Sequence, residues 1–158
     1  MTETCSIHLL ADAPDCIPTI AEWYKSEWST WFRDTPVAEI EEDFRAVANR
    51  NGLPIALAAC DGDDHPLGAC SVRADVFEPY AHAGPWLRGL YVHTPFRGQG
   101  IAQHLIRAAC DHAAQRQVPK LYAATHSAIK SFERAGWLGF DQVSHEGQLL
   151  TIFAKRIG

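Results

Sequence analysis

Residues 90–102 read LYVHTPFRGQGIA, and a strand, a turn and a helix meet in this short segment. The compact apolar run at 86–92 is typical of a strand. Gly98 and Gly100 then favour a tight turn, because glycine tolerates backbone angles that other residues avoid. The helix expected at 100–117 carries an apolar stripe formed by Ile101, Leu105, Ala109 and Ala113. The segment therefore predicts a strand that turns directly into an amphipathic helix.

A turn of this kind at the start of a helix is suited to binding a pyrophosphate. The first N–H groups of a helix have no intrahelical partner, and the helix dipole is positive at that end. Arg97 adds a formal positive charge. The pattern is not a dinucleotide fingerprint, because Gln103 stands where G-x-G-x-x-G needs its third glycine, and it is not a Walker A motif. Taken alone, the two glycines are also compatible with a connection that merely turns the chain.

The same segment also indicates how the other predicted elements are arranged. A helix between the strands expected at 86–92 and 120–125 makes those strands parallel, with a right-handed crossover. The other predicted elements are a strand at 6–10, a helix at 15–28, a helix after Pro36 that ends at Asn51-Gly52, strands at 54–60 and 67–76, a helix at 128–135 and strands at 140–143 and 149–155. We predict an α/β fold, a mixed sheet covered by helices on both faces, with residues 1–158 as one domain.

Composition excludes several classes of protein. The chain has 158 residues and a formal net charge of −5. An acidic chain is a poor general binder of nucleic acid, because affinity for phosphate backbones comes mainly from Lys and Arg. No apolar stretch approaches the roughly 20 residues that a membrane span needs. The composition therefore leaves room for a cationic or neutral small substrate and argues against nucleic acids and membranes as partners.

The cysteines and the N-terminal residues indicate a reducing compartment. Five cysteines occur without a C-x-x-C pair, which argues against a disulfide framework or a zinc site, and the eight histidines show no metal spacing. The first residues lack the basic start and apolar run of a signal peptide. We therefore expect free thiols, no bound metal and a cytoplasmic location.

Three short segments follow one another in the order and spacing of a known family. Arg97-x-x-Gly100-x-Ala102 matches R/Q-x-x-G-x-G/A, and the residues 90–92 before it are similar to a central strand. Downstream, SFERAGW at 131–137 is similar to L-Y-E-K-x-G-F. Together they resemble the GNAT superfamily of N-acetyltransferases, whose order of elements also matches the one predicted above over essentially the whole chain.

The resemblance implies an acyltransferase that uses acetyl-CoA. Such an enzyme transfers an acetyl group to a primary amine by direct attack in a ternary complex and needs no metal. The acceptor stays open between small-molecule and peptide amines, and dimers are common in the family, which leaves room for a homodimer. The alternative function is a catalytically weak or silent acyl-CoA-binding sensor or regulatory module.

The resemblance also implies which residues hold the cofactor. Backbone groups of the central strand would pair with the pantetheine arm like a missing strand; these residues are Leu90, Tyr91 and Val92. Backbone N–H groups of the turn would hold the pyrophosphate; they belong to Arg97, Gly98, Gln99, Gly100, Ile101 and Ala102. In the family the two parallel strands splay to admit the cofactor. Gly89 could assist that distortion as a bulge, or it could serve close side-chain packing.

One departure from the family concerns the acid that protonates the thiolate of coenzyme A. The tyrosine of L-Y-E-K often does so, but Phe132 stands there and has no proton to give, so it would only pack at the sulfur end of the cofactor. Substitutes are Tyr122, Thr125, His126 or a water. Because a thiol has a pKa near about 8.5, its thiolate is a tolerable leaving group even without strong acid help.

An amine attacks only when it is neutral, so a general base is also needed. Glu78 is the preferred candidate, with Asp75, His82, His93 and water as alternatives. In the family the region of the first helix often walls the acceptor site. Here that region carries aromatic residues, namely Trp23, Trp28, Trp31 and Phe32. These rings could receive a cationic amine beside Glu22 and Glu27, or they could simply pack the core.

Overall fold

The structure is a computed structural model that describes residues 5–74, 77 and 80–158. Its strands are β1 (Ser6–Leu9), β2 (Ile55–Cys60), β3 (Pro66–Arg73), β4 (Trp86–Val92), β5 (Lys120–Thr125), β6 (Leu138–His145) and β7 (Gln148–Arg156). Its α-helices are α1 (Ile17–Glu27), α2 (Val37–Val47), α3 (Ile101–Gln115) and α4 (Ile129–Arg134). The order of these elements is the predicted one.

The described strands form one seven-stranded sheet in the order β1-β2-β3-β4-β5-β7-β6. Every neighbouring pair is antiparallel except β4 and β5, which α3 connects and which run parallel. A helical crossover requires this parallel arrangement. The predicted mixed sheet is therefore confirmed, as is its parallel central pair.

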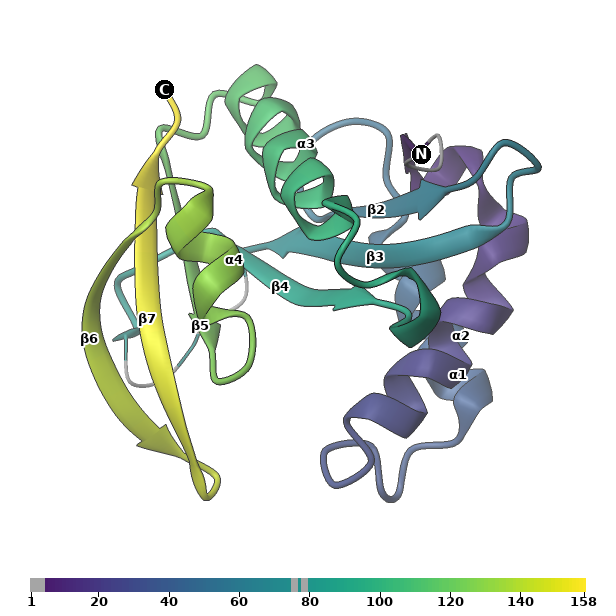
Figure 1. Ribbon diagram of the computed structural model, residues 1–158, viewed down its shortest axis with the longest axis horizontal. Coiled ribbons are helices and arrows are strands. Elements are labelled where there is room, and N and C mark those ends of the chain that lie inside the picture. The colour runs from purple at the N-terminus through teal and green to yellow at the C-terminus, as the bar shows by residue number, and fades with distance from the viewer. Residues whose placement is uncertain (1–4, 75–76, 78–79) are drawn as a thin grey trace.

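Helices cover the two faces of the sheet and bury separate cores. α3 and α4 lie on one face, and α1 and α2 lie on the other (Figure 1). On the first face, the apolar stripe of α3 is buried through Leu105 and Ala109. On the second, Ile20 of α1 and Ile40 of α2 pack against β2 and β3. The amphipathic patterns in the sequence are thus the patterns of burial, because each helix hides one stripe against the sheet.

The structure departs from the predicted bounds at the end of α2, which stops at Val47 and not at Asn51-Gly52, and at the C-terminal edge of the sheet. β6 and β7 extend beyond the predicted ranges 140–143 and 149–155. β6 is an edge strand, and nearly all its residues are exposed. An edge strand is held by main-chain hydrogen bonds to a single neighbour, so its ends need no apolar residues to mark them.

The central strands are close only where they begin. The pairing of β4 with β5 joins Trp86 to Tyr122, and the Tyr122 N–H donates to the carbonyl oxygen of Pro85 at 3.0 Å. Beyond this point β4 runs away from β5 toward α1 (Figure 1). The sheet is therefore splayed at the carboxyl ends of β4 and β5, directly before the glycine turn.

Candidate active site

The glycine turn leaves the start of α3 open to a ligand. Gly98 and Gly100 adopt left-handed backbone angles, with φ of 80° and 82°. A Cβ atom added at either residue would meet no neighbouring atom within 4 Å. Gly100 is the N-cap of α3, and no side chain caps the helix. The first amides of α3 are therefore available to an anion, in line with the general affinity of helix N-termini for phosphates.

The middle of β4 contains a bulge. Ala69 pairs with Tyr91 while Ser71 pairs with Arg88, so Gly89 and Leu90 together face a single residue of β3. Gly89 has a φ of 63°, which lies in the left-handed region. An extra residue in one strand bends that strand and increases its twist. The expectation that Gly89 assists the splay is thus matched by a bulge at this residue.

The side chains of 90–92 are engaged with the two cores. Leu90 and Val92 pack against the cluster under α3, whereas Tyr91 is buried in the cluster under α1 and α2. The Arg97 Nε donates to the carbonyl oxygen of Val92 at 2.7 Å. A ligand that paired with this carbonyl would have to displace the arginine. The roles of Leu90, Tyr91 and Val92 toward a cofactor concern their backbone, and they stay predictions.

Aromatic residues from α1 meet the end of β4. The ring of Trp23 stacks on His93 with centroids 4.3 Å apart and an interplanar angle of 12°. The His93 Nδ1 lies 3.1 Å from the hydroxyl of Tyr91. Burial raises the pKa of Tyr91, so this hydroxyl stays protonated at neutral pH. Sequence reasoning named Trp23 and His93 separately, and the structure brings them into one cluster.

Arg97 belongs to the same cluster. Its guanidinium lies over the ring of Tyr91, with Cζ 5.5 Å from the centroid. One of its terminal nitrogens is 3.5 Å from Oε1 of Glu27, which ends α1. A carboxylate and an aromatic ring therefore restrain the one formal charge of the turn.

The predicted catalytic residues lie in different places. Glu78 and Asp75 lie outside the described residues. Tyr122 lies at the paired base of the splay, where its ring is 5.4 Å from that of Trp86. His126 is exposed and follows the carboxyl end of β5. Tyr122 therefore lies within β5, whereas His126 lies just beyond its end.

Tyr122 also lines a hollow of about 840 Å³ at the base of the splay. The ammonium of Lys120 lies over its ring at 5.1 Å, and Tyr80 and Phe140 line the same hollow. The ring of Tyr122 is therefore held between neighbours at the end where β4 and β5 are still paired.

Phe132 occupies the core beneath α4. Its side chain is 2% exposed. Its ring stacks on Phe153 with centroids 5.4 Å apart and meets the edge of Trp137 at 4.9 Å. Protein atoms surround the ring, and its predicted contact with the sulfur end of a cofactor stays a prediction.

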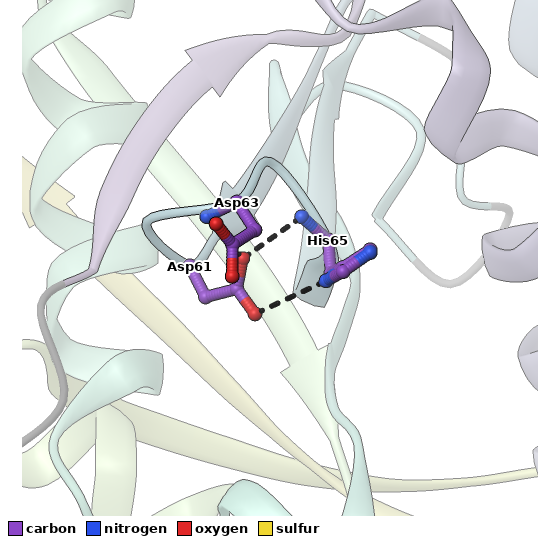
Figure 2. Close-up of side chains that lie close together, drawn as sticks. All are labelled: Asp61, Asp63 and His65. Atoms are coloured by element: carbon purple, nitrogen blue, oxygen red, sulfur yellow. Dashed lines mark hydrogen bonds and ion pairs between the residues drawn. The ribbon is translucent and has the colours of Figure 1, made fainter.

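A further cluster of polar side chains lies in the β2–β3 turn (Figure 2). Asp61 accepts backbone N–H groups of Asp63 and His65 at 2.8 and 3.0 Å. These two bonds hold the pKa of the Asp61 carboxyl below its usual value. The same side-chain-to-backbone pattern recurs in tight turns. The arrangement is accounted for by the turn alone, and we assign it a structural role.

Comparison with known families decides the class of the protein. Residues 17–137 match the profile of the Acetyltransferase (GNAT) family. The chain belongs to this family. It is an N-acetyltransferase domain with coenzyme A as its cosubstrate, as the signature around Arg97 and Gly100 predicted. No curated protein matches the chain.

Several solved structures share the fold of this acetyltransferase. An aminoglycoside 6'-N-acetyltransferase complexed with coenzyme A has a TM-score of 0.75 at 17% identity, over 98% of this chain and 97% of that one. Mutant forms of the spermidine/spermine N-acetyltransferase SpeG from Vibrio cholerae have 0.70 at 15%, over 97% and 95%. NAA60 of Arabidopsis thaliana in complex with acetyl-CoA has 0.69 at 17%, over 98% and 99%. At these identities the likeness concerns the fold alone.

One residue beside the bulge escaped sequence reasoning. Tyr24 falls on the apolar stripe of α1, and that position predicts only core packing. Its hydroxyl, however, donates to the carbonyl oxygen of Gly89. The signal that could have found it is a tyrosine at a buried helical position, because a buried hydroxyl nearly always has a hydrogen-bond partner. None of the described helices combines the length and apolarity that crossing a bilayer requires.

Proposed function

We propose that this acetyltransferase moves an acetyl group from acetyl-CoA to a primary amine of a small molecule or peptide, by direct attack in a ternary complex. The observation that carries the proposal is the uncapped start of α3 beside Gly98 and Gly100, immediately after a strand that splays from its parallel neighbour. A pyrophosphate fits such a backbone cradle, since it needs N–H donors and no side-chain bulk.

The cofactor-binding residues act mainly through their backbone. The amides of residues 98–102 hold the pyrophosphate, because the Arg97 N–H already donates to the carbonyl oxygen of Thr94 at 3.3 Å. Backbone groups of residues 90–92 pair with the pantetheine arm where β5 has diverged from β4. Arg97 must release the Val92 carbonyl for that pairing, and its guanidinium then lies near the phosphates. Phe132 supports this site from below by packing the core under α4.

The transfer needs two proton movements. The amine nitrogen bonds to the acetyl carbon, the carbon–sulfur bond breaks, and coenzyme A leaves as a thiolate. One proton leaves the attacking nitrogen for a base, for which Glu78 stays our candidate. One proton reaches the thiolate, and His126 is our candidate donor because it lies at the open end of β5. We do not carry Tyr122 into this role, because its ring is held at the paired end.

We place the acceptor amine on the α1 side of the splay. The loop after α1 carries Trp31, whose side chain is 57% exposed. Lys25 orders this loop by donating to the carbonyl oxygens of Phe32 and Thr35, both at 2.7 Å. An exposed indole on an ordered loop suits a cationic amine, through its apolar face and its ring quadrupole. The named activities of the aminoglycoside and polyamine acetyltransferases of this fold are consistent with such acceptors.

The test is acetyl transfer from acetyl-CoA across a panel of polyamines, aminoglycosides, amino acids and peptides. We expect turnover with at least one cationic amine, and a lower rate in His126→Ala with coenzyme A affinity retained. A general acid typically contributes about 10²–10⁴-fold, so the loss in rate should reach that range only if thiolate departure limits turnover. Tight binding of coenzyme A without turnover on any amine would instead favour the sensor function.

A further inference from the structure

The carbonyl group of Gly89 is held by a side chain from another element. Gly89 lies in the β4 bulge with a φ of 63°. Its carbonyl oxygen accepts the hydroxyl proton of Tyr24, which lies on α1. The preceding carbonyl, of Arg88, accepts a longer bond of 3.5 Å from the hydroxyl of Ser71. Side chains therefore take over hydrogen bonds at the bulge, where the ladder to β3 loses its register.

The ring of Tyr24 is enclosed and cannot move freely. It meets Trp28 and Phe44 edge-on, with centroids 4.8 and 5.0 Å apart and interplanar angles of 74° and 75°. Its side chain is 7% exposed, and burial raises its pKa, so the hydroxyl remains a donor at all physiological pH values. A Cβ atom on Gly89 would come within 2.9 Å of this ring. Tyr24 and Gly89 therefore define each other's position.

One peptide plane transmits this constraint to the next residue. The carbonyl of Gly89 and the N–H of Leu90 belong to the same peptide unit, which is planar. The peptide is trans, since the cis bonds among the described residues are Leu53-Pro54 and Gly84-Pro85. In a trans peptide the C=O and N–H point in opposite directions. Holding the Gly89 oxygen toward α1 therefore aims the Leu90 N–H away from α1.

We propose that Tyr24 is a positioning residue for acetyl transfer: by anchoring the Gly89 carbonyl it aims the Leu90 N–H at the oxygen of the transferred acetyl group. This inference rests on the proposed function, in which the backbone of 90–92 lines the reacting end of the cofactor. A donor aimed in advance at developing negative charge stabilises the transition state more than the bound substrate. The hydroxyl of Tyr24 thus affects kcat more than substrate binding.

The test is Tyr24→Phe, which removes the hydroxyl and keeps the ring. We expect kcat to fall about ten-fold or more, because a misaimed donor loses part of the effect of an oxyanion donor. The KM for acetyl-CoA and the calorimetric affinity for coenzyme A should stay close to those of the wild type. Hydrogen exchange of the Leu90 amide, measured without any substrate, should become faster.

Ile40→Val is the matched control. Ile40 is buried in the same core as Tyr24 but makes no bond to β4, and losing one methylene lowers stability by an amount comparable to losing one hydrogen bond. The control should keep the wild-type kcat and the wild-type exchange of Leu90.

Two results would overturn the positioning role. One is an unchanged kcat and unchanged Leu90 exchange in Tyr24→Phe. The other is equal losses of kcat in both variants, which would show that destabilisation of this core is the cause. Failure of the wild-type protein to acetylate any amine would count against the proposed function instead, while the exchange of Leu90 would still report on the anchor.

Discussion

Gly100 and Gly89 share a left-handed backbone, yet the space beside them is used in opposite ways. At Gly100, an added Cβ atom would meet nothing within 4 Å. At Gly89, it would lie 2.9 Å from the ring of Tyr24. The first glycine leaves open space at the start of α3, where we propose that a ligand binds, whereas the second leaves room for the ring of Tyr24. A glycine in a functional strand–turn–helix can therefore be required by binding or by packing, and only its neighbours tell the two cases apart.

The largest expected effect is a loss of stability in Gly89→Ala. The alanine must adopt a φ of 63° and also displace the ring of Tyr24. Left-handed backbone costs about 1–2 kcal/mol and overpacking about 1–3 kcal/mol, so the free energy of unfolding should fall by roughly 2–5 kcal/mol. Gly52→Ala is the control, because Gly52 has a φ of 70° and open space around its Cβ position. Urea denaturation of both variants measures the difference.

The difference between these two alanine variants isolates the contact with Tyr24. If Gly52→Ala lowers the free energy of unfolding as much as Gly89→Ala does, then the ring of Tyr24 moves aside without cost. That result would contradict our claim that Gly89 is required by packing. A second expectation concerns binding, because the shifted bulge should also weaken coenzyme A in Gly89→Ala but not in Gly52→Ala.

The next effect is on affinity rather than stability. Gly100→Val puts a branched side chain into the open cradle before α3, where we place the pyrophosphate. We expect the affinity for coenzyme A to fall at least about ten-fold by calorimetry, which corresponds to roughly 1.4 kcal/mol. Gly147→Val is the matched control, since Gly147 has a φ of 81°, open space, and a place in the β6–β7 turn.

Both valine variants should lose similar stability, about 1–2 kcal/mol for the left-handed backbone. Only Gly100→Val should lose affinity. Equal affinities in the two variants would place the phosphate cradle elsewhere in the molecule.

A smaller effect on stability is expected for Phe132→Tyr. This variant tests whether a hydroxyl added at a packed position can reach a bound ligand. The ring is enclosed by Phe153 and Trp137, so the new hydroxyl would be buried away from solvent. Burying a hydroxyl with an incomplete set of partners should cost about 1 kcal/mol of stability. The rate with acetyl-CoA should not rise. A rate gain of about 10²-fold would show instead that the hydroxyl reaches the thiolate as an acid.

The smallest effect concerns pH and sets the conditions for the other measurements. Burial lowers the pKa of His112 on α3, with Arg116 adding to the shift. The folded state therefore binds this proton less readily than the unfolded state, whose histidine titrates near about 6.5. Stability should fall as the pH is lowered through this value, because the unfolded state then takes up more protons. His112→Gln should flatten the dependence of urea midpoints on pH between about 7 and 5.

Much of the fold could be predicted from the sequence, because the apolar patterns of its helices and strands match the faces that are buried in the structure. The stripe on α3 predicted a helix and is the face that packs on the sheet. The helix between two apolar runs predicted the parallel pair β4 and β5. The edge of the sheet was harder to predict: β6 lies beside a single strand, and its apolar residues Leu138 and Phe140 are exposed, so they mark no buried face. Apolar patterns in a sequence reflect burial, so they are weak guides to strands whose residues are exposed.

The candidate site divides in the same way. By itself, the sequence determined the glycine turn, the helix after it and the family, because all three are encoded in residues that are close together along the chain. Only the tertiary structure decided that Phe132 is enclosed, that Tyr122 lies where β5 still pairs with β4, and that Tyr24 holds the carbonyl of Gly89. These facts join residues as many as 65 positions apart. No local pattern encodes such contacts, since they depend on how α1 packs against β4, the central strand of the sheet.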